Sequence, residues 1–396
     1  NRGNCSDLDT GCLAFRKNIR ENMMYSLSNL TNQENVDETS LSSWASSLSS
    51  LTQSPAELTP ASAERAMGLA NHTISQAGAA AAEVDSVDGL VGVLQATDAV
   101  FTYSGMYNDD IVHNNSSGSG SKSAREITAI TSAFAQVLSG TMYVGQNKTE
   151  MIYKNFRLSS VVQRVYSNIA TTSAPSSGSA SIFAPQTEDE RNAGVVPASV
   201  ALSSNNSNDE SNVAVNMVTL SNSNAYGLQS DVLTSQPLYI QLLPPATTAA
   251  NTRPSDLVKE VEFTFPFSSK QTQFTEYVPV TFTSTCSSYH ANYTYICPDS
   301  GYMVHHNCSN GLGEYSTICP KPAPACAKLV LNNVNTDAML SIPTACRVLR
   351  YSDSAVTCAC SILPSSTSAT TANDSSSSDS GGIRRLQSDE EALLDQ

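Results

Sequence analysis

The sequence has little charge and few basic residues. Only 14% of its 396 residues are charged, and 21 Lys and Arg stand against 36 Asp and Glu, which gives a formal net charge of −15 at pH 7. No run of five or more basic residues occurs anywhere. Because neutralising phosphates requires clustered Lys and Arg, the composition argues against nucleic acid as a partner. Abundant Ser, Thr and Asn favour a glycosylated surface over a salt-bridged cytosolic one.

Long hydrophobic runs are missing as well. No apolar stretch reaches the roughly 18 residues that could span a bilayer, and the chain begins Asn1-Arg2-Gly3, without Met or a signal peptide. We therefore expect a processed or excised piece of a longer precursor. A membrane would be reached only through precursor regions outside this chain.

Histidine is scarce, and the usual catalytic signatures are absent. The chain has five His, no Gly-X-Ser-X-Gly elbow in a strand–turn–helix setting, no P-loop and no His-Glu-X-X-His. We expect no enzymatic activity and no cofactor, and the Gly118–Gly120 stretch predicts a flexible loop instead of a phosphate cradle.

The first 150 residues predict a helical subdomain. Apolar residues recur at helical spacing in three stripes, and Thr59 followed by Pro60 is typical of a helix start. Ser123 with Glu126 predicts a capping box, and Gly140 can close that helix. A polar loop, 114–121, is expected before it. The stripes are Leu41, Trp44, Leu48 and Leu51; Leu90, Leu94, Thr97 and Phe101; and Ile127, Ile130, Phe134 and Val137.

From about residue 150 the hydrophobic period changes to two. Short strands punctuated by Pro, Gly and Asn predict an antiparallel β-sandwich, interrupted by long polar loops at 173–181 and 203–212. The chain therefore has an expected α+β class, with helices first and a sandwich second. The strand candidates are the alternating Val213, Val215 and Met217; Val261, Phe263, Phe265 and Phe267; and the runs 238–243, 278–282, 329–331, 347–351 and 355–358.

Ten cysteines and ten glycosylation sequons indicate an oxidising, extracellular or cell-surface location. A single sequon can arise by chance, so the prediction rests on the sequons and the cysteines occurring together. N-glycans are expected at the acceptors. Cys5 and Cys12 are close enough in sequence to pair locally. The acceptors are Asn4, Asn29, Asn71, Asn114, Asn115, Asn147, Asn205, Asn292, Asn307 and Asn373.

The last four cysteines form a recognisable motif. Cys326, Cys346, Cys358 and Cys360 end in a Cys-X-Cys followed by Ser361-Ile362-Leu363-Pro364. This pattern resembles the proteolysis-site motif of GAIN domains, which terminates the extracellular parts of adhesion receptors and polycystin-like proteins. The order of a helical block before a sandwich is similar too. The aromatic residues usual in the motif are missing, since Ala327-Lys328-Leu329 follows the first cysteine.

The resemblance implies a helical subdomain A at 1–150 and a β subdomain B at 151–363, with the motif at 326–363. It further implies that Cys326 pairs with Cys358 and Cys346 with Cys360. Self-cleaving members carry an imidazole base two residues before a hydroxyl nucleophile. Here Ile362 and Pro364 occupy those positions, so no self-cleavage is expected. Residues 364–396 are rich in Ser, Thr, Asp and Gly and predict a disordered tail.

A second cysteine group, with a spacing of eleven residues, lies at 286–319. One interpretation is a zinc site of Cys and His ligands. The other, favoured in an oxidising compartment, is a small loop-rich insert with two disulfides, for which three connectivities remain open. Because the GAIN motif lacks this Tyr-rich insert, we expect it to carry this protein's own binding specificity. Its cysteines are Cys286, Cys297, Cys308 and Cys319.

The sequence thus predicts a non-catalytic extracellular adhesion or assembly module of a larger cell-surface protein. The expected partners are extracellular proteins or copies of the chain itself. The alternative is a structural glycoprotein of an extracellular filament or appendage. A self-cleaving domain is the least supported class.

Overall fold

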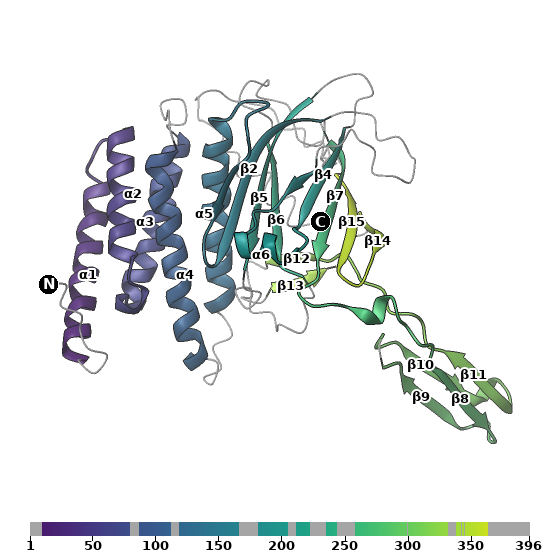
Figure 1. The fold of residues 1–396 in the computed structure, drawn as a ribbon. Helices are drawn as coiled ribbons and strands as arrows, with labels where there is room; N and C mark the ends of the chain where they lie inside the picture. Colours follow the sequence, from purple (N-terminus) through teal and green to yellow (C-terminus); the bar gives the residue numbers. More distant parts are fainter. Residues whose placement is uncertain are drawn as a thin grey trace, which may run out of the picture.

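The computed structural model describes residues 10–79, 87–111, 119–165, 181–204, 211–221, 235–243, 258–298, 300–331, 338–341, 343 and 345–362. The helices of this part are α1 (Thr10–Thr31), α2 (Glu38–Thr52), α3 (Pro60–Ala79), α4 (Val91–Ile111), α5 (Ser119–Gly140) and α6 (Glu188–Asn192). The strands are β1 (Thr149–Ile152), β2 (Phe156–Val165), β3 (Ile182–Phe183), β4 (Ser199–Ser204), β5 (Ser211–Leu220), β6 (Leu238–Leu243), β7 (Val258–Pro266), β8 (Thr281–Cys286), β9 (Asn292–Ile296), β10 (Met303–Asn307), β11 (Gly313–Ile318), β12 (Lys328–Leu331), β13 (Ala338–Ser341), β14 (Cys346–Tyr351) and β15 (Ala355–Ser361). The predicted α+β class is confirmed, with helices first and antiparallel sheets after them (Figure 1). Four disulfides staple the part that follows the helices.

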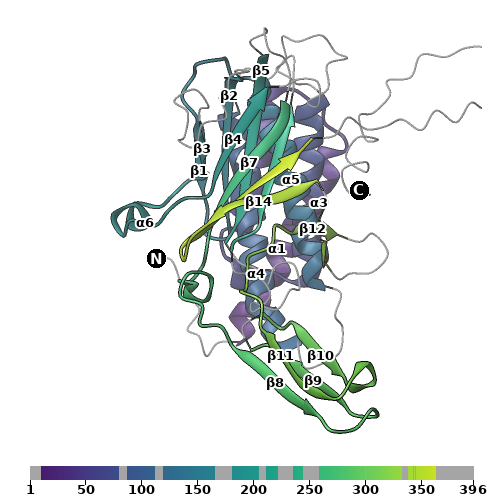
Figure 2. The ribbon, with the colours of Figure 1, turned by 90° about the vertical axis from the view of Figure 1, so that its right-hand side faces the viewer.

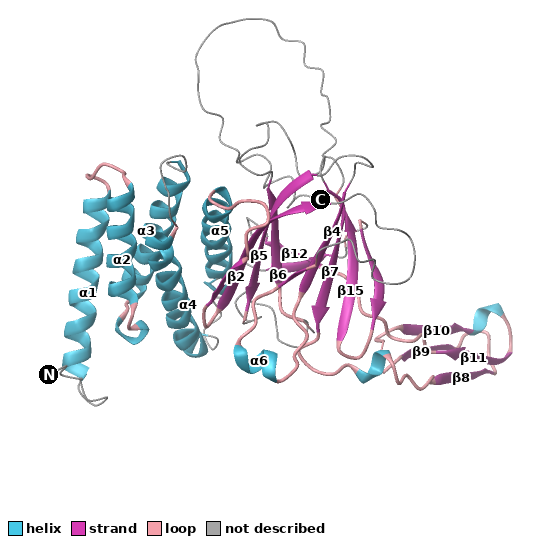
Figure 3. Cartoon of the chain, turned by 45° about the horizontal axis from the view of Figure 1, so that its top comes forward, coloured by secondary structure: helices cyan, strands magenta, loops and turns pink. Residues whose placement is uncertain are grey.

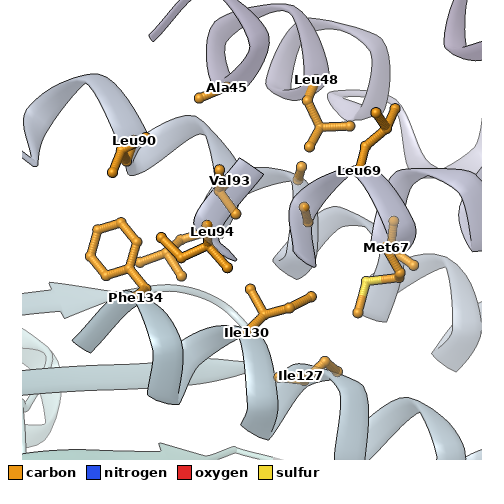
Figure 4. Close-up of a cluster of buried hydrophobic side chains, with 14 of the residues drawn as sticks. Ala45, Leu48, Met67, Leu69, Leu90, Val93, Leu94, Ile127, Ile130 and Phe134 are labelled. Atoms are coloured by element: carbon orange, nitrogen blue, oxygen red, sulfur yellow. The ribbon is translucent and has the colours of Figure 1, made fainter. Parts of the chain in front are cut away.

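Helices α1 to α5 form a layer whose core is built from the predicted stripes. Leu94, Ile130 and Phe134 are fully buried and point into one cluster between the helices (Figure 4). Two helix starts follow capping rules. The Asp37 carboxylate accepts a hydrogen bond from the Ser40 amide at 2.7 Å, and the Thr59 hydroxyl accepts one from the Ser62 amide at 3.1 Å.

Two features of the helical layer differ from the sequence prediction. Helix α5 begins at Ser119, so the predicted capping box at Ser123 is wrong, and the end of the predicted 114–121 loop is helical. A helix continues through Ser and Gly when its apolar face is packed, because tertiary packing outweighs intrinsic propensity. Helix α1 lies within the predicted helical subdomain, but no apolar stripe was named for it. Only Met24 and Leu27 supply buried large apolar side chains there, so its pattern is weak.

A four-stranded sheet, in the order β1-β2-β5-β6, is the middle layer of the molecule. One face of β2 and β5, with Phe156 and Val218, packs into the helical core. The other face, with Val215 and Met217, packs against the second sheet. Both faces are therefore buried, which explains why the residues between the predicted valines, such as Asn216, are also buried. Asn216 accepts a hydrogen bond from Ser160 at 2.6 Å, which satisfies its buried amide oxygen.

The second sheet has the order β14-β15-β7-β4-β3, and all its pairs are antiparallel. Its inner residues Val200, Leu202 and Val261 close the sandwich core. Figures 2 and 3 show the resulting stack of helices, first sheet and second sheet. The chain's last described strand, β15, lies in the interior of its sheet, between β14 and β7.

Several strand boundaries differ from those that the sequence predicted. The run 278–282 was predicted as a strand, whereas β8 covers Thr281–Cys286. The predicted polar loop 203–212 is shorter, because β4 includes Ser203 and Ser204 and β5 begins at Ser211. The 173–181 loop and the predicted tail, 364–396, fall almost wholly outside the described residues.

Strands β8 to β11 project from the sandwich as a separate unit, here called the finger (residues 281–319; Figures 1 and 3). Its four strands form two antiparallel pairs, β8 with β11 and β9 with β10. Among the described residues, no helix combines the length and the apolar character needed to cross a membrane.

Candidate functional site: the stapled last strand and the finger

Strand β15 is held by both hydrogen bonds and disulfides. Its residues pair with β14 on one side and with β7 on the other. Cys346 lies directly opposite Cys360 in the β14–β15 register, and the two are bonded, with their Cα atoms 4.0 Å apart. Cys358 is buried and bonded to Cys326 across 6.1 Å between Cα atoms. These are the two pairs that the GAIN resemblance implies.

The residue at the expected base position continues from β15 into the core. Ile362 follows the end of the strand and packs against the apolar cluster between the two sheets. Its neighbour Ser361 donates its amide to the Ala345 carbonyl at 2.9 Å. Pro364, at the expected nucleophile position, lies outside the described residues. An isoleucine side chain has no titratable group, so it cannot take a proton from a hydroxyl.

The finger is a small two-layer structure, so the prediction of a loop-rich insert was wrong. Cys286 bonds to Cys308 and Cys297 bonds to Cys319, each across 22 residues. All four sulfurs are therefore in disulfides, and the thiolates that the zinc interpretation requires do not exist. Strands β9, β10 and β11 were missed because they are five or six residues long and several carry apolar side chains outward, which removes the polar–apolar alternation.

A histidine organises the interior of the finger. The His306 side chain is buried, and its Nδ1 lies 2.6 Å from the Ser284 hydroxyl while its Nε2 lies 2.8 Å from the Thr317 hydroxyl. Its ring contacts Phe282, which stacks on Tyr295 with ring centroids 4.7 Å apart. Both ring nitrogens thus have partners from the opposite pair of strands, which gives the finger a hydrogen-bonded core of its own.

The finger exposes a set of large apolar side chains. Such side chains mark interaction surfaces when they gather on one unit. The finger is also the part of the described chain farthest from the helical layer (Figure 3). The exposed residues are Tyr289, Ile296, Tyr302, Met303, Leu312 and Ile318.

The glycosylation acceptors within the described residues are all exposed. Asn29 lies on α1, Asn71 on α3, and Asn147 before β1. Asn292 and Asn307 face each other across the β9–β10 pair, and both lie at the end of the finger that the Cys286–Cys308 bridge closes. Their side chains share the outer face of that pair, because directly opposed residues of antiparallel strands point the same way.

The remaining acceptors, Asn4, Asn114, Asn115, Asn205 and Asn373, lie outside the described residues, as does Cys5. Cys12, in the first turn of α1, is disulfide-bonded.

A cleft of about 240 Å³ opens where the β3–β4 connection, with α6, meets the ends of β2, β5 and β7. Arg157 and Glu190 line it and bind each other in a two-pronged ion pair, with both N–O distances 2.6 Å. Hydrogen bonds from Arg157 lower the pKa of the Glu190 carboxyl below its ordinary value, although partial burial opposes this. Since the charges of this pair satisfy each other, the cleft offers no unpaired charge from these two residues.

The fold and these residues define a disulfide-stapled α+β module of three layers with a protruding finger. No known family model matches the chain, and no curated protein matches it. Among solved structures, the chain is similar to the full extracellular region of zebrafish Gpr126/Adgrg6, with 10% sequence identity and a TM-score of 0.38 over 83% of this chain and 34% of that chain. The chain thus spans about a third of that region's length. The resemblance to GAIN domains therefore rests on the cysteine motif and on the order of helices and sheets.

Proposed function

We propose that this chain is a non-catalytic extracellular adhesion or assembly module, a GAIN-like segment of a larger cell-surface protein that stays uncut. One observation carries the proposal. Strand β15 lies inside its sheet, is stapled to the preceding chain by Cys326–Cys358 and Cys346–Cys360, and leads into an isoleucine where a cleaving relative would need a base. A covalent bond that persists beyond β15 makes the module a continuous mechanical link.

An extracellular location is supported by two independent features. Within the described residues every cysteine is disulfide-bonded, as expected where thiols are oxidised. The five acceptors in that part are exposed, at positions where glycans would not disturb the core. We propose that the chain is organised as a helical subdomain at 1–150, a β subdomain at 151–363 and a tail at 364–396.

The finger is the proposed contact region for an extracellular protein partner. It has its own core, its own disulfides and exposed aromatic and aliphatic side chains, which are the residue types enriched at protein interfaces. Its base is closed by a hydrogen bond from the Cys319 amide to the Val280 carbonyl at 2.7 Å. The rest of the fold therefore tolerates removal of the finger if the short gap is bridged.

The test is a finger deletion measured in a cell-binding assay. Residues 281–319 are replaced by Gly-Gly, and the purified chain is applied to cells that bind the intact protein. Binding should fall at least tenfold, while tryptophan fluorescence from Trp44 in the helical layer keeps its unfolding midpoint. As a matched control, Ser316→Ala in β11 alters an exposed residue of the finger and should leave binding unchanged. Undiminished binding by the correctly folded deletion would remove the finger from the proposal.

A second candidate, a subunit of an extracellular filament, is favoured by helix α1. This outermost helix exposes Phe15, Ile19, Met23 and Leu30 along one side. A second copy's α1 packed antiparallel on that side would form a two-fold dimer, from which a filament grows through a further head-to-tail contact. Two 22-residue helices, each about 33 Å long, would bury an area at the low end of specific interfaces, on the order of 1,000 Å².

Sedimentation of the chain at rising concentration separates the two candidates. Association that Phe15→Asp with Met23→Asp abolishes supports the filament subunit. A monomer at all concentrations favours the adhesion module, in which copies are not required.

A further inference from the structure

The equal spacing of the finger cysteines gives the finger an unusual covalent topology. Bridges join Cys286 to Cys308 and Cys297 to Cys319, and each cysteine follows the previous one eleven positions later. The two bridges are therefore connected by three chain segments of the same length. Strand β9 lies in the first, β10 in the second and β11 in the third. A pull entering at Cys286 and leaving at Cys319 is shared by three equal arms.

The Cys326–Cys358 bridge connects this unit to the last strand. A pull on the chain after Ser361 reaches Cys360 and, two residues further back, Cys358. The Cys326–Cys358 bridge passes it to Cys326, only seven residues after the finger's last cysteine, whereas the route through Cys346–Cys360 is longer and stays slack. Strands β12, β13 and β14 lie in the loop that this bridge closes, so they carry no tension. The Cys346–Cys360 bridge also carries no tension, because Cys346 lies inside the loop that Cys326–Cys358 closes.

While the fold is intact, the hydrogen bonds of β15 to β7 and β14 resist such a pull. Once β15 separates from β7, the covalent path decides how far it can move. Along the chain, Pro266 and Ser361 are about 95 residues apart, on the order of 330 Å when extended. Through the bridges the path has about 40 residues, on the order of 140 Å.

We propose that the finger lies in series with the tension on β15, and that its bridges together with Cys326–Cys358 form a redox-sensitive limit on how far this strand can leave its sheet. The shorter tether keeps the strand near its place and favours its return, because effective concentration falls with about the −3/2 power of tether length. Reduction by a dithiol lengthens the tether. Each bridge takes two electrons and two protons and becomes two thiols, while the dithiol becomes a cyclic disulfide.

The inference rests on the proposed function only for the assumption that force acts at the C-terminal side. Single-molecule force–extension of the full chain, held at its two ends without reductant, measures the path directly and needs no binding partner. A failure of the adhesion proposal would therefore leave these lengths unchanged. Mass spectrometry of the non-reduced variants confirms which bridges remain.

Four variants give three distinct values of the added length: none, about 18 residues and about 22 residues. Cys297→Ser with Cys319→Ser should leave the maximum extension unchanged. The remaining Cys286–Cys308 bridge passes the pull to the segment 308–319, which is as long as each of the three original arms. Removing all four finger cysteines should add about 22 residues, roughly 75 Å. Cys326→Ser with Cys358→Ser should add about 18 residues, roughly 60 Å, since tension then runs through Cys346–Cys360. Cys346→Ser with Cys360→Ser is the matched control and should add nothing.

The maximum extension depends on covalent connectivity alone, so a variant that folds poorly still reports its path. Lengthening by about 11 or 22 residues in the variant with Cys297→Ser and Cys319→Ser would overturn the three-arm topology. An unchanged extension in the Cys326 and Cys358 variant would overturn the series connection. After a drop in force, β15 should return about twofold more slowly without the four finger cysteines, and an equal rate would show that the limit does not assist its return.

Discussion

At the scale of single residues, close contacts decide more than composition does. Gly92 in α4 lies against α2, where a Cβ atom would come within 2.3 Å of the Ala45 carbonyl oxygen. Gly68 in α3 has open space at the same position. Two glycines that look alike in the sequence therefore have opposite roles. One permits two helices to approach, and the other only weakens its helix.

Gly92→Ala should destabilise the protein by about 1–3 kcal/mol, because α2 and α4 must move apart. Gly68→Ala is the matched control and should stabilise the protein by roughly 0.5–1 kcal/mol through helix propensity. Urea unfolding followed by the fluorescence of the single Trp44 measures both. Equal effects of the two substitutions would contradict the close helix contact.

Glu190 gives the pH dependence of one ion pair. Its pKa is lowered in the folded state by hydrogen bonds from Arg157, so its contribution to stability is present above its ordinary pKa near 4.5 and is lost as the pH falls below that value. Glu190→Gln should cost roughly 0.5–1 kcal/mol at pH 7, and the difference from the native protein should shrink toward pH 3.

Glu188→Gln, on the exposed side of the same short helix, is the control for this pH effect. It should leave the pH profile of the unfolding midpoint unchanged. A gap between the native protein and Glu190→Gln that stays constant from pH 7 to pH 3 would show that the pair with Arg157 is not the source.

At the scale of elements, one asparagine joins the helical layer to the first sheet. The Asn155 amide donates to the Asp98 carboxylate at 2.9 Å, and its side chain donates to the Thr102 hydroxyl at 2.7 Å and to the Asp98 backbone carbonyl at 3.0 Å. Asp98 and Thr102 belong to α4, whereas Asn155 lies in the turn before β2. The contact fixes where the sheet begins relative to the helices.

Asn155→Ala should therefore destabilise the fold by about 1–3 kcal/mol, since it leaves partners in α4 without their donor. Asn22→Ala, which removes a hydrogen bond within the exposed side of α1, should change the free energy of unfolding by less than about 0.5 kcal/mol. Thermal unfolding by circular dichroism distinguishes the two. Similar losses in both variants would mean that the layers are joined mainly by apolar packing.

At the scale of the whole molecule, the end of β15 determines whether the chain remains in one piece. In the proposed GAIN-like module, Ile362 stands where a cleaving member has its base and Pro364 where it has its nucleophile, and neither side chain can perform that chemistry. A reducing, denaturing gel of the secreted protein should show one full-length species. Two fragments in equal amounts, produced by cleavage near Leu363, would contradict the proposal that the chain stays uncut.

The glycans give a second whole-molecule prediction. Expressed in a secretory host, the chain should lose mass on treatment with an amidase that removes N-glycans, and Asn292→Gln and Asn307→Gln should each reduce that loss by one glycan. The exposed Asn32→Gln, which is not in a sequon, is the control and should leave the mass loss unchanged. If neither finger variant changes the mass loss, Asn292 and Asn307 carry no glycans, and that end of the finger is accessible to a partner.

The sequence by itself determined the class of the fold, and it is the source of the prediction that the chain does not cleave itself. Helical stripes such as Leu41 to Leu51, strands such as Leu238–Leu243, and a motif without base or nucleophile depend on local periodicity and residue identity, which a single chain displays. The weak pattern of α1 and the short strands of the finger gave no such signal, because much of their apolar surface faces outward.

Only the tertiary structure decided which elements share a layer, which cysteines of the finger are bonded and where force can travel. Four equally spaced cysteines allow three pairings, and their spacing favours none of them. The choice depends on which strands lie side by side, and that arrangement is set by long-range burial such as the stacking of Phe282 on Tyr295 across two hairpin layers. Contacts between residues distant in sequence carry no local signature, and so the path of tension through the finger became visible only in the folded chain.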